Sequence, residues 1–168
     1  WRGEGGGVLL NQCPHNLDLY QWFFGLPQRV AGFAHIGKYH NIEVEDEVTA
    51  YFEHENGMVG HFVTTTAESP GTNRLEIVGE MGKLVFENGQ LTFYRNEKSM
   101  LENLRTSTIA FDSVASHPEE LPFTPLADWG HALVTEAFAH AILHGGKLIA
   151  YAPEGLNGLM LGNAIMLS

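Results

Sequence analysis

A helical pattern of apolar residues follows a run of glycines near the start of the chain. The apolar positions recur at steps of three and four, as on the buried side of a packed helix: Leu9, Cys13, Leu17, Tyr20 and Phe24. The pattern predicts one helix that opens at the glycines and ends at Gly25, with a kink at Pro14 because proline cannot donate to the helical ladder. Trp22 and Phe24 are predicted to belong to the core.

Alternating apolar and polar residues in the middle of the chain are typical of β-strands. The predicted strands span residues 29–39, 48–53, 58–66, 75–78, 83–86 and 91–94. On one side of the first strand we expect Val30, Gly32, Ala34 and Ile36. Asn56-Gly57 favours a primed two-residue turn between the second and third strands. Together these segments predict an antiparallel meander of about six strands.

Two further helices are predicted near the C-terminus. One spans Asp128 to Leu143 with Asp128 as its cap, and the other opens at Pro153-Glu154-Gly155. Residues 97–125 have weak periodicity and receive no assignment. Strands in mid-chain with helices at both ends predict an α+β fold, in which one open, mostly antiparallel sheet of about six or more strands has helices packed on one face. We expect residues 1–168 to form a single domain of this kind.

Composition restricts the class of protein. The 168 residues are 44% hydrophobic, which is enough to build a core without disulfides or metals. Twenty Asp and Glu residues against nine Lys and Arg give a net charge of -11, so we expect no nucleic-acid or membrane partner. Cys13 alone cannot form a disulfide framework, and the chain shows no apolar run of about 18 residues and no signal-peptide pattern. These features predict a cytoplasmic protein.

Asn11 and His15 are the first candidates for chemistry. They stand four residues apart in the predicted helix, so both side chains lie on one face, just beside the apolar stripe. Histidine is the side chain best suited to proton transfer near neutral pH. The pair predicts part of an active site. The alternative is a histidine that is hydrogen-bonded within the core.

The same stretch carries a family resemblance. Residues 5–25, GGGVLLNQCPHNLDLYQWFFG, resemble the first helix of the C-terminal domain of the Gfo/Idh/MocA oxidoreductases. Further segments follow in the order typical of that family: Glu43-Val44-Glu45-Asp46, residues 73–79, Glu136-Ala137-Phe138 and Pro153-Glu154-Gly155-Leu156. The resemblance extends over nearly the whole chain.

The resemblance implies a substrate-binding and oligomerisation domain of an NAD- or NADP-dependent dehydrogenase. In the family, a separate N-terminal Rossmann domain holds the cofactor and contributes a catalytic lysine. The chain opens at Trp1 without Met, directly before a motif that the family places in mid-sequence, so we expect an N-terminal portion beyond this chain. The polypeptide alone would then transfer no hydride. The uncovered face of the sheet is expected to join subunits into a homodimer or homotetramer.

The resemblance also assigns catalytic roles. His15 matches the family histidine, which takes or relays the hydroxyl proton while a hydride passes to the nicotinamide. Asn11 stands where many members carry Asp, so its amide can orient a hydroxyl but cannot share a proton. We therefore expect His15 to pair with the lysine of the Rossmann domain.

Further residues are candidates for binding a sugar, an inositol or a related polyol. A polar, turn-rich segment supplies hydroxyl, amide and guanidinium groups from Thr66, Asn73 and Arg74, although a plain solvent-exposed loop has the same composition. Trp1 and Arg2 could offer a stacking surface and a donor to a sugar ring. Lys38 and His40 are weaker candidates of the same kind.

Two other functions remain open at this stage. One is a non-catalytic sugar-binding or assembly module of the same fold, suggested by Asn11 in place of Asp. The other is a metal-dependent sugar isomerase or lyase, suggested by the nine histidines. His140 and His144 have the spacing of two zinc ligands, but Ala141 stands where an HExxH motif needs Glu. We therefore predict no metal site. The glycine-rich stretch Gly3-Glu4-Gly5-Gly6-Gly7 is not a dinucleotide fingerprint, because Val8 stands where the third glycine of GxGxxG is needed.

Overall fold

The computed structural model of the chain describes residues 5–122 and 130–168, and these form two compact units. The first unit comprises the described residues up to Ser69 together with Gly130–Ser168, and the second begins at Pro70. Both combine helices with antiparallel strands, which confirms the predicted α+β class. None of the helices in the described part is long and apolar enough to cross a membrane.

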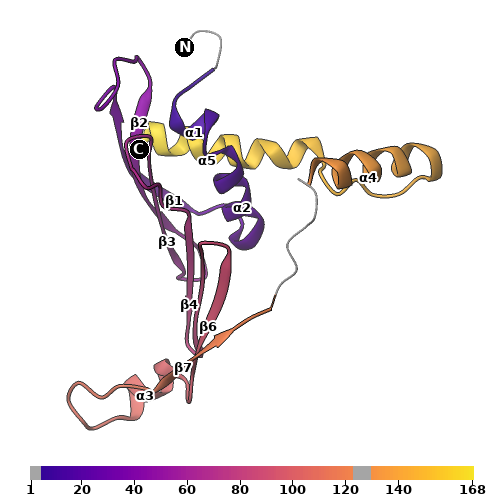
Figure 1. The fold of residues 1–168 in the computed structure, drawn as a ribbon. Coiled ribbons are helices and arrows are strands. Elements are labelled where there is room, and N and C mark those ends of the chain that lie inside the picture. The colour runs from indigo at the N-terminus through magenta and orange to yellow at the C-terminus, as the bar shows by residue number, and fades with distance from the viewer. Residues whose placement is uncertain (1–4, 123–129) are drawn as a thin grey trace. The chain divides into compact units, whose positions relative to one another are not determined.

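The first unit is a three-stranded antiparallel sheet with helices (Figure 1). The strands lie in the order β1-β2-β3. Their bounds are Arg29–Ile36 for β1, Glu45–Glu53 for β2 and Val59–Thr65 for β3. The helices are α1 (Val8–Asn11), α2 (Pro14–Phe24), α4 (His131–His144) and α5 (Gly155–Leu167), with a short 3₁₀ turn, η1 (Ala152–Glu154), before α5.

The predicted first helix is in fact two helices, which corrects the expectation of one kinked helix. The N–H groups of Gln12 and Cys13 both donate to the carbonyl of Val8, at 3.1 and 2.9 Å, so the helical ladder of α1 closes there. Pro14 occupies the first turn of α2. The N–H groups of a first turn have no partner within the helix, so the missing N–H of proline costs no helical hydrogen bond there. Residues 11 and 15 therefore belong to different helices, and their four-residue spacing does not place them on one helical face.

The core of the first unit lies between the sheet and α1, α2 and α5. The predicted helical stripe is confirmed at Leu9, Cys13 and Leu17, all of which are buried. Alternate residues of β2 face the same core, joined by residues of α5; they are Val48, Ala50, Phe52, Leu161 and Ile165. Trp22 was wrongly predicted to be core, because it lies two residues beyond Tyr20 on the other side of α2 and is 70% exposed.

The opposite face of this sheet carries exposed apolar side chains. Phe33 of β1, Thr49 of β2 and Val63 of β3 are paired in one row across the three strands. Phe33 is 75% and Val63 69% exposed. Ile36 was predicted to share one side of β1 with Val30, but a register shift between His35 and Ile36 interrupts the alternation, and Ile36 is exposed.

Helix α4 is present as predicted, but it does not cover the sheet. None of its residues is buried, although the predicted apolar residues Phe138 and Ile142 stand four residues apart, as on one side of a helix. Periodicity defines an apolar stripe on a helix without defining what packs against it. The described helix begins at His131, and the expected cap Asp128 lies outside the described residues.

The second unit is a four-stranded antiparallel sheet in the order β4-β5-β6-β7. Its elements are β4 (Arg74–Gly79), β5 (Gly82–Glu87), β6 (Gln90–Asn96), α3 (Met100–Thr106) and β7 (Ser116–Glu120). The strands thus form two sheets where one was expected, because the chain between β3 and β4 passes through Ser69-Pro70-Gly71 and does not return as a hairpin. Strand β7 was not predicted, since it is a fully exposed edge strand that contains Pro118.

The primed two-residue turn occurs at a different Asn-Gly pair from the one expected. Asn88 and Gly89 both have positive φ, 51° and 72°, and they connect Glu87 directly to Gln90. In the β2–β3 hairpin only Gly57 has positive φ, and a three-residue loop closes between His54 and Met58. The β2–β3 hairpin therefore uses a longer turn than the predicted two-residue one.

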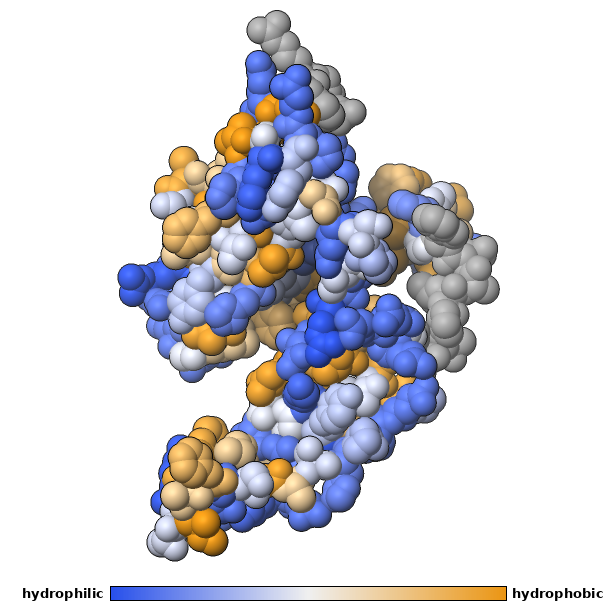
Figure 2. Space-filling view, turned by 60° about the vertical axis from the view of Figure 1, so that its left-hand side comes forward, coloured by the Kyte–Doolittle hydropathy of each residue, from blue (hydrophilic) through white to orange (hydrophobic). Residues whose placement is uncertain are grey.

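Residues between β6 and β7 form an exposed apolar end of the second unit. Figure 2 shows apolar side chains gathered there, around α3. The exposed apolar residues of this segment are Leu101, Leu104, Ile109 and Phe111. Helix α3 has only seven residues, which is too short to give a readable helical period. This explains why the sequence pattern assigned no element to the segment.

Candidate functional site

A cavity of about 430 Å³ lies beside the N-terminus of α1 in the first unit. Its walls come from the glycine turn, from α1, from the segment before β2 and from the residue after β3. The described lining residues are Gly6, Gly7, Val8, Asn11, Gln12, His40, Asn41, Ile42, Val44, Glu45 and Thr66. Amide, hydroxyl, imidazole and carboxylate groups on an apolar frame are typical of a site for a small polar ligand, and the volume lies in the usual range.

Glu45 fixes the position of α1 against the sheet. The N–H of Leu9 donates to Glu45 Oε1 at 3.1 Å, and Glu45 is only 5% exposed. A Cβ on Gly7 would collide with both the main-chain oxygen and the carboxylate of Glu45. The glycine therefore serves close approach of two backbone segments, as expected for a glycine at a helix start that has no dinucleotide role.

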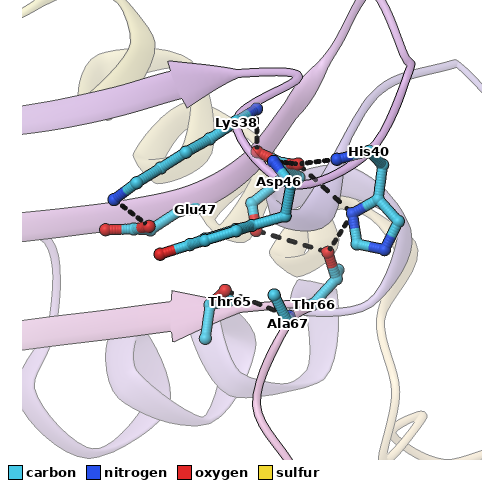
Figure 3. Close-up of polar contacts among 8 residues, drawn as sticks. Lys38, His40, Asp46, Glu47, Thr65, Thr66 and Ala67 are labelled. Carbon is cyan, nitrogen blue, oxygen red and sulfur yellow. Dashed lines mark hydrogen bonds and ion pairs between the residues drawn. The ribbon is translucent and has the colours of Figure 1, made fainter.

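Asp46 organises the turn that brings His40 to the cavity (Figure 3). Its fully buried side chain accepts hydrogen bonds from the N–H groups of Lys38, Tyr39 and His40 at 2.9, 2.8 and 3.0 Å. Burial acts to raise the pKa of Asp46, but these three bonds and one from the His40 ring outweigh burial and lower it to about 2. The main-chain N–H groups of the turn thus stabilise the ionised carboxylate, and the carboxylate in turn fixes the conformation of the turn.

Thr66 joins this cluster from the end of β3. Its N–H donates to the carbonyl of Asp46 at 3.0 Å, and its Oγ1 lies 3.4 Å from the same carbonyl and 3.3 Å from Nδ1 of His40. His40 and Thr66 therefore stand side by side on the cavity wall (Figure 3). Hydroxyl, imidazole and amide groups in one wall can donate to and accept from the hydroxyls of a ligand.

The structure brings together three of the residues that the sequence proposed for the site. Asn11, His40 and Thr66 all line the cavity. His15 is exposed in the first turn of α2, and it is not among the described lining residues. The helix break between α1 and α2 separates it from Asn11.

Among the described residues that line this cavity, Lys38, Asn73 and Arg74 do not occur. The Lys38 amine donates to Glu47 at 2.5 Å. Arg74 belongs to the second unit, where its guanidinium pairs with Glu76 and Glu87 at 2.5 and 2.6 Å. Asn73 is an exposed residue of the same unit. The predicted residues Trp1 and Arg2 lie outside the described part of the chain.

Sequence reasoning missed Glu45 and Asp46 as site residues, along with Gln12 and Asn41. A signal for Asp46 was present in the alternation of β2. Asp46 is in phase with Val48 and Ala50, which face the core, so a charged residue stands at a buried position. A buried carboxylate needs several donors, and this requirement points to an organising role.

The described residues hold no group of three or more His, Cys, Asp or Glu side chains arranged to bind a metal ion. His140 and His144 are neighbours on α4, with ring centroids 4.8 Å apart. All described lining residues of the cavity come from the first unit, and their chemistry suits hydroxyl groups.

Comparison with known families identifies the chain. The sequence profile of the GFO/IDH/MocA C-terminal domain matches residues 1–85, just over half of the 168 residues. The chain belongs to the Gfo/Idh/MocA family. Within this family profile lie the glycine turn, α1, the Asp46 cluster and Thr66, so all the described lining of the cavity falls inside the matched region. No curated protein sequence matches the chain.

Solved structures share the fold of this Gfo/Idh/MocA chain. The WlbA dehydrogenase of Bordetella pertussis, in complex with NADH and UDP-GlcNAcA, is 22% identical with a TM-score of 0.69, over 97% of this chain and 44% of that one. WlbA of Chromobacterium violaceum, with the same two ligands, is 23% identical with a TM-score of 0.73, over 97% and 44%. The UDP-N-acetylglucosamine 3-dehydrogenase GnnA of Acidithiobacillus ferrooxidans is 18% identical with a TM-score of 0.70, over 95% and 46%. The chain thus spans about half the length of these structures.

Proposed function

We propose that this chain is the substrate-binding domain of an NAD- or NADP-dependent oxidoreductase that acts on a CH–OH group of a sugar, an inositol or a related polyol. Family membership supports the proposal, and so do the dehydrogenases that share the fold. Since the chain spans about half of those proteins, we further propose that a Rossmann domain elsewhere in the full-length protein binds the cofactor.

The cavity beside α1 is the single observation that carries the proposal. Its polar groups include those of Asn11, His40 and Thr66, and its volume of about 430 Å³ lies in the usual range of sites for small molecules. The amide of Asn11, the hydroxyl of Thr66 and the neutral imidazole of His40 can each donate and accept a hydrogen bond. A polyhydroxyl ligand presents matching donors and acceptors on neighbouring carbons.

Oxidation of a carbinol needs a hydride acceptor and a base. The hydride leaves the carbinol carbon, the O–H proton passes to the base, and a carbonyl remains. The nicotinamide ring supplies the hydride acceptor when bound. We propose that His15 takes or relays the proton together with a lysine of the Rossmann domain, and that the Asn11 amide orients the reacting hydroxyl. The support for His15 is its match to the family motif and its place in the first turn of α2, close in sequence to the cavity residues Asn11 and Gln12.

The exposed face of the first sheet supports a proposal about assembly. Phe33 and Val63 lie in one cross-strand row and are mostly exposed. Exposed apolar residues that lie together are typical of a surface that another subunit covers. We propose a homodimer or homotetramer joined through this face. A cytoplasmic location stays a prediction from composition.

A second candidate function has one observation in its favour. Asn11 replaces the Asp that many family members carry, and its amide cannot take a proton. A non-catalytic sugar-binding module of the same fold would retain the cavity and lose turnover. Binding without oxidation would distinguish this function from the dehydrogenase.

The deciding experiment measures reduction of NAD⁺ and NADP⁺ by the full-length protein. The panel consists of inositols, hexoses, sugar acids and UDP-N-acetylhexosamines, with binding measured in parallel by calorimetry. Turnover that disappears in His15→Ala supports the dehydrogenase and identifies the substrate class. Binding of a sugar with no turnover on either cofactor supports the non-catalytic module.

A further inference from the structure

His40 presents one ring nitrogen to two oxygen atoms. Its Nδ1 lies 3.2 Å from Oδ2 of Asp46 and 3.3 Å from Oγ1 of Thr66 (Figure 3). Both partners are themselves held in place, Asp46 by three main-chain N–H groups and Thr66 by the end of β3. The orientation of the His40 ring is therefore set by Asp46 and Thr66, which both lie outside the turn that carries His40.

The chemistry of these two oxygens decides which nitrogen carries the proton. Asp46 is ionised throughout the neutral range, since its pKa is about 2, so its carboxylate can only accept. The Thr66 hydroxyl donates its hydrogen to the Asp46 carbonyl, which leaves oxygen lone pairs facing the ring. Two acceptors at Nδ1 require a hydrogen on Nδ1.

A neutral imidazole with hydrogen on Nδ1 has a lone pair on Nε2. Nε2 lies on the side of the ring away from Asp46 (Figure 3). Within the described part of the chain no residue is hydrogen-bonded to it, and the side chain is 47% exposed on the wall of the cavity. The lone pair is therefore accessible to a ligand.

We propose that Asp46 is a positioning residue that, together with Thr66, fixes His40 in the Nδ1–H tautomer, and that Nε2 accepts a hydrogen bond from a ligand hydroxyl. This inference rests on the proposed function, whose sugar or polyol supplies that hydroxyl. A ligand carboxylate has no hydrogen to offer this lone pair. The carboxylates of Glu45, on the cavity wall, and Asp46, behind His40, also repel it. The subsite at His40 thus selects a neutral hydroxyl over an acid group.

The test is ¹⁵N NMR of the full-length protein labelled at its histidines, recorded where imidazoles are neutral. The two ring nitrogens of each histidine report directly which one is protonated. His40→Gln assigns the resonances by their loss. His54 is an internal control, because its Nε2 is hydrogen-bonded to Tyr20 and the residue does not line the cavity. Neutral polyols and hexoses are then added, with the matching uronic acids as comparison.

We expect a protonated Nδ1 and an unprotonated Nε2 for His40. At least one neutral sugar should shift the Nε2 resonance, and none of the matching uronic acids should shift it. The His54 resonances should stay unchanged. A protonated Nε2 in the unmodified protein overturns the inference, and so does an Nε2 resonance that no neutral sugar moves. Turnover with an unmoved Nε2 refutes this inference alone, whereas a sugar-shifted Nε2 without turnover refutes only the proposed dehydrogenase.

Two variants separate positioning from a merely structural role. In Asp46→Asn the amide can donate as well as accept, so we expect a mixture of the two tautomers. In Thr66→Val the carboxylate remains, and we expect Nδ1–H to persist with a shifted Nδ1 resonance. The spectrum of the unmodified protein decides the tautomer even where Asp46→Asn does not fold. An unchanged tautomer in folded Asp46→Asn shows that Asp46 does not position the ring.

Discussion

Asp46 and His40 are joined twice. Oδ2 of Asp46 accepts from the main-chain N–H of His40 at 3.0 Å and lies 3.2 Å from Nδ1 of the same residue. One buried carboxylate thereby fixes both the backbone of the turn and the orientation of its imidazole. Since His40 lines the cavity, the local fold and the binding surface depend on the same charged group.

Replacing Asp46 by Asn should destabilise the protein in a pH-dependent way. The pKa of Asp46 falls from its ordinary value of 3.8 to about 2 in the folded protein, so its carboxylate contributes stability that is complete above pH 3.8 and is lost toward pH 2. We expect Asp46→Asn to lower the Tm at pH 7 by on the order of 5 °C, and the difference to shrink as the pH falls through this interval.

The measurement is thermal unfolding of both proteins from pH 7 to pH 2. Glu47→Gln is the matched control, because the adjacent Glu47 pairs with Lys38 at the surface and such pairs contribute little. A difference between Asp46→Asn and the unmodified protein that stays constant down to pH 2 would contradict the depressed pKa.

Gly7→Ala should displace α1 from the sheet. The added Cβ would meet the main-chain oxygen of Glu45, which cannot move without disturbing the start of β2. Overpacking of this kind costs about 1–3 kcal/mol of unfolding free energy. Denaturant unfolding checks the cost, with Gly71→Ala as control because nothing lies within 4 Å of its added Cβ. Equal stability of the two variants would show that α1 and Glu45 do not pack closely.

His15→Ala should lower turnover of the full-length enzyme about a hundredfold or more while the fold is retained. This is the usual scale for losing a general acid or base. Steady-state kinetics with the substrate identified from the panel provides the measurement. His35→Ala is the control, since His35 is exposed near the end of β1 and is absent from the cavity lining. Unchanged turnover in His15→Ala would remove His15 from the catalytic residues.

Phe33→Glu should break the proposed oligomer. A carboxylate in the row formed by Phe33, Thr49 and Val63 would have to be buried without a partner when subunits associate. Light scattering should give a dimer or larger for the unmodified protein and a smaller mass for the variant. Trp22→Glu, at another exposed apolar residue on α2, should leave the mass unchanged. A monomeric mass for the unmodified protein would exclude this interface.

Much of the local structure could be predicted from the pattern of residues. Leu9, Cys13 and Leu17 form the buried stripe that their spacing indicated, and Val48 alternates inward with Ala50 as expected for a half-buried strand. Such periods follow from backbone geometry alone, which repeats every few residues in a helix and every second residue in a strand. The positions of β1 to β6 were predicted within a few residues for the same reason.

The candidate site was predictable only in part. Asn11, His40 and Thr66 were named from residue type and motif, and the structure places all three on one cavity. The break before Pro14 was underestimated, because a proline inside a helical pattern can either kink a helix or begin a new one, and the local sequence permits both. His15 consequently lies on another helix from Asn11.

The sequence by itself determined the family, the α+β class, the buried side of α1, α2 and β2, and the residue types available for chemistry. Only the tertiary structure decided that the strands form two sheets, that α4 has no buried residue, and that Asp46 organises the cavity. The contact of Leu9 with Glu45 spans 36 positions of the chain, and that of His40 with Thr66 spans 26. A local pattern of apolar and polar residues records which side of an element is buried, whereas the identity of a distant hydrogen-bond partner depends on how the elements pack.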